Sequence, residues 1–178
     1  MRDAIGGALT IQIILVFLIL VNGYLAITVN YTKAFRVKNG IVSVIERNEG
    51  LTETAGKSIT ELMRNAAYSV PLPYLNKCYE QGYSPVYPSQ LSSLGAGSTG
   101  GGFCYKRTDI DPTGSGVYTG REYSVVTYVN INVPGLNRIF QLVPHIFSVK
   151  GETKTIYSNK RDWFSSCRRW DANGNCIS

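Results

Sequence analysis

The feature that most constrains this chain is an uncharged run of 29 residues, residues 4–32, which lies between Asp3 and Lys33. A helix of about 20 predominantly apolar residues crosses a bilayer, so this run is long enough to span one. A cleaved secretory signal has an apolar region of roughly 7–15 residues followed by a small-x-small site. The run is longer than that and no such site follows Val29. We therefore interpret it as a membrane anchor.

The run contains side chains that are unusual for an isolated helix facing lipid. Thr10, Gln12, Asn22 and Gly23 are polar or small. Such residues are tolerated at membrane depth where they meet another helix. We therefore expect Gln12, Asn22 and Gly23 to belong to an assembly surface.

The helical pattern continues beyond the anchor. One apolar stripe with i, i+3, i+7, i+10 spacing extends the expected assembly surface, and its members are Ala34, Val37, Ile41 and Val44. The spacing predicts one helix over residues 5–49, about 65 Å long, half in the membrane and half amphipathic. Gly50 is the predicted stop. The alternative is an anchor followed by a separate helix, with a break at Gly40.

The rest of the chain predicts an α+β domain. We divide the chain into an assembly helix, residues 1–50, and an extracytoplasmic domain, residues 51–178. A short second helix is expected over residues 54–67, capped by Thr52 or Thr54. Residues 69–116 are rich in proline and glycine and predict loops. Their "GAGSTGGG" stretch lacks the Gly-Lys-Ser/Thr ending of a phosphate loop, so it is interpreted as a flexible loop.

Two later segments predict strands of a small antiparallel sheet. Residues 121–134 alternate, with Ser124 and Tyr128 on one face and a core face made of Tyr123, Val125, Thr127, Val129, Ile131 and Val133. The run over residues 145–157 is expected to pair with this strand, its core face being His145, Phe147 and Val149. We expect three or four strands packed on the amphipathic half of the long helix. His145 is interpreted as a packed strand residue.

All four cysteines follow the apolar run: Cys78, Cys104, Cys167 and Cys176. An even number on one side of an anchor favours disulfides in an oxidising compartment. Four cysteines allow three pairings, and sequential pairing closes the shortest loops. We therefore favour Cys78–Cys104 and Cys167–Cys176. Zinc is disfavoured because the sequence has no C-x-x-C motif and a single histidine.

The cysteines place the domain outside the cytoplasm, whereas the charges flanking the anchor favour a domain inside it. Lys33, Arg36, Lys38 and Arg47 follow the run and only Arg2 precedes it, which by the positive-inside rule favours a cytoplasmic domain. Large domains translocate largely regardless of charge. We therefore follow the cysteines and expect the bulk of the chain outside the cytoplasm, at the cell surface.

Several function classes are disfavoured. The net charge of +6 is dispersed and does not predict a nucleic-acid partner. One histidine and four disulfide-type cysteines offer no nucleophile–base pair, so we expect neither an enzyme nor a cofactor. The "DANGN" stretch presents the oxygen ligands Asp171, Asn173 and Asn175 like the start of a calcium loop, but it lacks the glycine and bidentate acid. We interpret the stretch as an Asn-Gly turn inside a Cys167–Cys176 bridge, and no metal is expected.

The order of these features resembles a type IV pilin-like subunit, within that class the TadE-like minor pilins or pseudopilins of Gram-positive bacteria. The residues that carry the resemblance are "GALTIQIILVFL" (7–18), "KAFRVKNGIVSVIERNEG" (33–50) and "SVKGETKTIY" (148–157). The resemblance implies a subunit that is inserted in the membrane, trimmed at a glycine by a prepilin peptidase, and drawn into a helical filament by an ATPase-driven machine.

Carried onto this sequence, the resemblance makes Gly6 or Gly7 the cleavage-site glycine and Ala8 the first mature residue. Gln12 then occupies the fifth position, where pilins usually have glutamate. The expected function is a structural subunit of a pilus or pseudopilus, whose partners are copies of itself or other pilins, and the membrane before assembly. The alternative is a monomeric, single-pass membrane-anchored extracellular binding domain.

Overall fold

The computed structural model of the chain describes residues 2–92, 101–111, 120–129, 148–158 and 162. It is an α+β fold in which a long helix carries a four-stranded antiparallel sheet of order β1-β2-β3-β4. The elements in chain order are α1 (Arg2–Asn48), α2 (Glu53–Asn65), α3 (Leu72–Asn76), η1 (Tyr79–Gln81), β1 (Ser84–Val86), α4 (Pro88–Leu91), β2 (Phe103–Ile110), β3 (Gly120–Tyr128) and β4 (Ser148–Glu152).

Helix α1 is continuous, as predicted, and passes through Gly40 without a break. The alternative of two separate helices is therefore wrong for this structure. Gly40 has a packing role instead, because a Cβ there would collide with the Cδ1 atom of Leu62 in α2. Glycine at this position lets the two helices approach closely.

Helix α1 ends one residue earlier than the glycine stop predicts. Glu49 takes the left-handed conformation with φ of 59° and donates its N–H to Glu46 O. Gly50 N–H then reaches back to Ile45 O over 3.0 Å, which completes a Schellman-type cap. The chain turns at this cap, and the buried Leu51 leads into α2.

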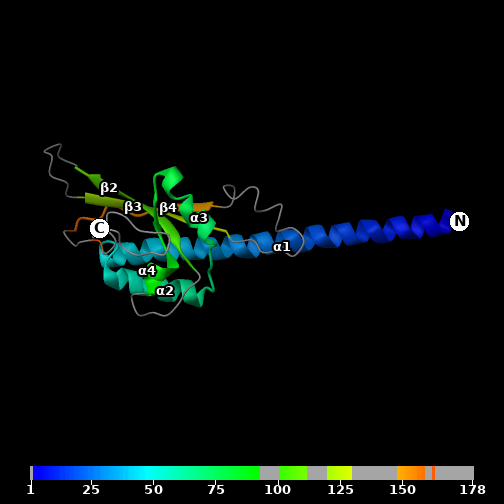
Figure 1. Cartoon of the computed structure of the whole chain (residues 1–178), viewed down its shortest axis with the longest axis horizontal. Coiled ribbons are helices and arrows are strands. Elements are labelled where there is room, and N and C mark those ends of the chain that lie inside the picture. The colour runs from blue at the N-terminus through cyan, green and yellow to red at the C-terminus, as the bar shows by residue number, and fades with distance from the viewer. Residues whose placement is uncertain (1, 93–100, 112–119, 130–147, 159–161, 163–178) are drawn as a thin grey trace.

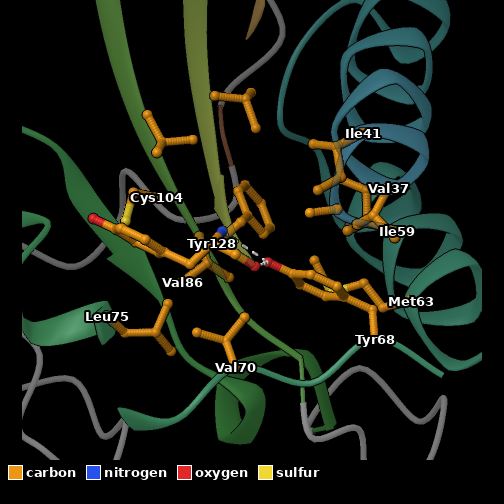
Figure 2. Close-up of a cluster of buried hydrophobic side chains, with 14 of the residues drawn as sticks. Val37, Ile41, Ile59, Met63, Tyr68, Val70, Leu75, Val86, Cys104 and Tyr128 are labelled. Atoms are coloured by element: carbon orange, nitrogen blue, oxygen red, sulfur yellow. Dashed lines mark hydrogen bonds between the residues drawn. The ribbon is translucent and has the colours of Figure 1, made fainter. Parts of the chain in front are cut away.

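Helix α2 returns antiparallel along α1 and confirms the predicted second helix. The Thr52 hydroxyl accepts from Ala55 N–H over 3.3 Å at its start. Ile59 and Met63 are fully buried on the inner face of α2, where they meet Val37 and Ile41 of α1 (Figure 2).

The segment predicted as loops contains strands β1 and β2 and the short helices α3 and α4, so the loop prediction is wrong for these elements. Strand β2 lies between β1 and β3 and pairs Cys104 with Val126. Its lead-in glycines are packed closely, because a Cβ on Gly102 would lie 2.6 Å from Val86 O. The described end of the glycine-rich stretch therefore serves close packing.

The sheet packs on the amphipathic half of α1, as expected (Figure 1). Thr127 in β3 donates its hydroxyl to Ala34 O over 3.1 Å, and Val149 in β4 pairs with Thr127 on the same face. Tyr128, predicted on the outer face, is only 2% exposed. The Tyr74 ring packs 5.8 Å from the Tyr128 ring, so segment 72–83 covers the second face of β3. Four residues of the predicted core faces lie outside the described residues: Ile131, Val133, His145 and Phe147.

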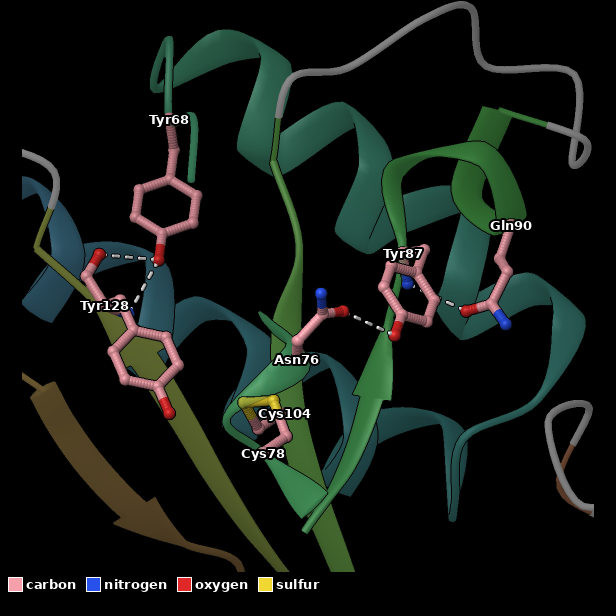
Figure 3. The surroundings of a disulfide bond; sticks show 7 residues. All are labelled: Tyr68, Asn76, Cys78, Tyr87, Gln90, Cys104 and Tyr128. Atoms are coloured by element: carbon pink, nitrogen blue, oxygen red, sulfur yellow. Dashed lines mark hydrogen bonds between the residues drawn. A yellow bond between two sulfur atoms is a disulfide. The ribbon is translucent and has the colours of Figure 1, made fainter. Parts of the chain in front are cut away.

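The Cys78–Cys104 disulfide is present and confirms the first predicted bridge (Figure 3). It fastens the covering segment to β2, and both cysteines are buried. Nearby, Tyr87 donates its hydroxyl to Asn76 Oδ1 over 3.1 Å. Cys167 and Cys176 lie outside the described residues, and so does the "DANGN" stretch.

Candidate functional site: the projecting half of the N-terminal helix

The N-terminal half of α1 extends well beyond the sheet and α2 (Figure 1). The large apolar side chains from Leu9 to Val29 are mostly between 38% and 69% exposed, Ile27 being less so. This helix is long and apolar enough, by length and composition, to cross a membrane. A helix that is apolar all round requires lipid or other helices as its surroundings.

Four polar side chains at the C-terminal end of the projecting half each donate one hydrogen bond within the helix. Each donates to the carbonyl oxygen four residues earlier over 2.7–2.9 Å: Asn22, Thr28, Asn30 and Thr32. Such local bonds remove the need for water at these donors. These bonds therefore lower the cost of placing the four side chains in an apolar environment.

The helix brings two of the predicted assembly residues onto one face and places the third elsewhere. Gln12 and Gly23 are separated by about three turns, and Asn30 lies about five turns from Gln12, so the three share a face. Asn22 lies about 100° around the helix from Gly23, and its Nδ2 atom is 2.7 Å from Leu18 O. The shared face of Gln12, Gly23 and Asn30 is the one that the domain covers further along α1.

The amphipathic stripe belongs to the core of the same chain. Ala34, Val37 and Ile41 are 0–1% exposed beneath the sheet and α2, and Val44 packs partly buried against the same core. Because Ala34, Val37 and Ile41 are covered within one subunit, we do not retain them as an assembly surface, and the assembly role of Val44 stays a prediction.

The predicted processing residues lie in the first turns of α1. Gly6, Gly7 and Ala8 are all helical. Their role in cleavage stays a prediction.

A buried carboxylate that the sequence did not single out fixes the domain to the end of α1. Asp162 Oδ1 accepts from Tyr123 O–H over 2.5 Å and from Leu51 N–H over 3.1 Å, and its Oδ2 accepts from Arg107 over 2.9 Å. Burial, and then the bonded Asp162 carboxylate, raise the pKa of the Tyr123 hydroxyl. With its oxygens occupied by these donors, the carboxylate positions structure and does not present itself to a substrate.

Within the described residues, no group of three or more histidine, cysteine or acidic side chains is arranged to hold a metal ion. No protein-family model, curated protein or solved structure matches this chain. The projecting half of α1 is therefore the candidate functional site.

Proposed function

We propose that this chain is a structural subunit of an extracellular filament of the type IV pilus or Tad-like class, assembled through its N-terminal helix. The observation that carries the proposal is the division of α1. Its C-terminal half is built into the domain core, and its N-terminal half presents apolar surface all round. A subunit of this shape has a rigid stalk to bury and a head that remains outside.

Packing between copies supplies a physical route from subunit to filament. Small residues such as Gly23 let helix backbones approach, and amide side chains such as Gln12 can bond across a helix pair. Heterologous packing of one helix on the next does not close into a ring unless the rotation fits, so it extends as a filament. The pilin-like order of long helix, sheet and disulfide supports the same proposal.

The proposed location is the membrane before assembly and the cell surface afterwards. The Cys78–Cys104 bridge supports an oxidising compartment for the domain. The projecting half of α1 supplies the membrane span before assembly.

A monomeric, membrane-anchored extracellular binding domain is the second candidate. The internal hydrogen bonds of Asn22 and Asn30 favour it, because they satisfy one amide N–H of each side chain without a partner helix. The two candidates differ in what the face around Gly23 contacts.

Gly23→Leu distinguishes the candidates. In a helix-packed filament the added side chain overpacks the contact at about 1–3 kcal/mol per subunit, so polymerisation fails while membrane insertion survives. In a bare anchor the change is harmless, since leucine favours lipid. The measurement is negative-stain imaging of sheared surface material together with the amount of chain in the membrane fraction.

Thr28→Leu is the matched control, because Thr28 lies about 140° from Gly23 around the helix. We expect filaments from the control and none from Gly23→Leu. Filaments of normal number and length from Gly23→Leu would contradict packing at this face. Absence of filaments from the unchanged chain would remove the filament proposal itself.

A further inference from the structure

The end of the apolar span and the base of the domain lie at nearly the same level along α1. Residues 9–29 extend about 31 Å at 1.5 Å per residue, which matches a hydrocarbon thickness of about 30 Å. Ala34 is the first fully buried α1 residue of the core. With the span in a bilayer, the base of the domain therefore lies in the headgroup layer.

Basic residues gather at this level. Between residues 4 and 45 the chain carries three charged side chains, all cations: Lys33, Arg36 and Lys38. Arg36 is exposed and Lys33 half-buried. Because α2 runs antiparallel to α1 with Leu62 against Gly40, the basic last turn of α2, at Arg64, returns to the same level.

Lys38 is turned into the protein instead. Its side chain passes against Gly151 of β4, and its ammonium lies 4.5 Å from the centre of the Phe35 ring. This contact holds a cation beside an exposed aromatic ring at the domain base.

Exposed apolar side chains accompany the cations. Tyr31 and Phe35 are 48% and 43% exposed on α1. Leu72 is 50% exposed in the segment whose Tyr74 packs on Tyr128, next to the Thr127–Ala34 contact. Tyrosine is enriched at the headgroup level, because its apolar ring and polar hydroxyl suit the boundary between lipid and water.

We propose that the domain base binds anionic phospholipid headgroups in the leaflet on its own side. We define the domain base as Lys33, Arg36 and Arg64 with Tyr31, Phe35 and Leu72. Guanidinium and ammonium groups match lipid phosphates, and juxtamembrane cations are attracted to anionic surfaces. The cations directly follow the apolar span along α1, at the level where that span leaves the bilayer, so the ligand that we propose is lipid. The proposal rests on membrane insertion and stands whether or not the chain polymerises.

The test uses the full chain in nanodiscs of equal parts phosphatidylcholine and phosphatidylglycerol, after alkaline extraction of vesicles has verified integration. Native mass spectrometry then measures which lipids the released chain retains. We expect the unchanged chain to retain phosphatidylglycerol several-fold above its bulk share. Lys33→Gln with Arg36→Gln should return the ratio toward bulk, since each cation near an anionic surface contributes roughly fivefold.

Two variants separate local charge from folding and net charge. Lys33→Arg with Arg36→Lys keeps the charge and should keep the preference. Lys57→Gln with Lys106→Gln removes two cations from exposed positions away from the base and should also keep it. Raising salt to about 0.5 M should weaken the preference of the unchanged chain.

A bulk lipid ratio in the unchanged chain would overturn the proposal. Equal loss of preference in the Lys57 and Lys106 variant would do the same by assigning the effect to net charge. A chain removed by alkaline extraction would overturn it at the first step. If lipid preference fails while surface filaments still form, the filament proposal is unaffected.

Discussion

Replacing Asp162 should destabilise the domain far more than replacing Asp109, although both carboxylates pair with Arg107. Asp162 is 3% exposed as a side chain and bonds to Arg107 over 2.9 Å, whereas Asp109 is 39% exposed and bonds over 2.7 Å. The two carboxylates differ in burial and in the additional donors that Asp162 accepts from, Leu51 N–H and Tyr123 O–H. They therefore form a matched comparison within one molecule.

The magnitude follows from the donors that lose their acceptor. Asp162→Ala leaves Leu51 N–H and Tyr123 O–H buried without it, at about 1–3 kcal/mol each. Arg107 is 31% exposed and can turn to water, so it adds less. We expect a loss of about 3–5 kcal/mol in the free energy of unfolding, and about 2–3 kcal/mol for the isosteric Asp162→Asn. Asp109→Asn should cost less than about 0.5 kcal/mol, as surface ion pairs do.

Urea unfolding of the full chain in detergent measures these differences. The tyrosine signal in near-ultraviolet circular dichroism reports the domain, while the apolar half of α1 stays helical and would obscure a far-ultraviolet signal. Tyr123→Phe in the Asp162→Ala background should cost less than it does alone, because the two share one hydrogen bond. Equal destabilisation by Asp109→Asn and Asp162→Asn, or an Asp162→Asn protein within about 0.5 kcal/mol of the unchanged chain, would contradict this prediction.

Three further predictions concern alkaline pH, close packing and the disulfide. Burial, and then Asp162, raise the pKa of Tyr105 to about 12. Its contribution to stability is thus complete below pH 10 and lost at about 1.4 kcal/mol per pH unit between pH 10 and 12. Tyr105→Phe should therefore make this part of the urea-measured profile less steep by about that amount, while buried tyrosines such as Tyr68 and Tyr123, whose pKa values are also raised, keep the remaining slope. Gly102→Ala places a Cβ against the Val86 carbonyl oxygen, which is backbone and cannot turn away, and should cost about 1–3 kcal/mol in the same assay. Replacing both Cys78 and Cys104 by serine should lower the free energy of unfolding by about 3.5 kcal/mol, as expected for a bridge of sequence separation 26. A reductant should lower the free energy of unfolding of the unchanged chain by a similar amount. An unchanged urea midpoint in reductant, or in Gly102→Ala, would contradict the corresponding expectation.

Elements whose signal lies in neighbouring residues could be predicted from the sequence. The uncharged run and the stripe from Ala34 onward predict α1, because helix periodicity and bilayer length are both readable from neighbouring residues. The alternation after Arg121 predicts β3, and Thr52 predicts the start of α2, for the same reason. The first disulfide also followed from sequence, since the nearest cysteines close the shortest loop.

Which surfaces meet could not be predicted from the sequence and follows from the folded arrangement. The stripe of Ala34, Val37 and Ile41 suits either a neighbouring subunit or the chain's own sheet, and the sheet occupies it. Strand β2 lies in a segment whose prolines and glycines mask its alternation, and its pairing with β3 supplies the backbone partners that stabilise it. Asp162 accepts hydrogen bonds from Leu51, 111 residues away in sequence, and from Tyr123, 39 residues away. Contacts of that separation leave no periodic signal in the chain, because they depend on where distant elements come to lie after folding.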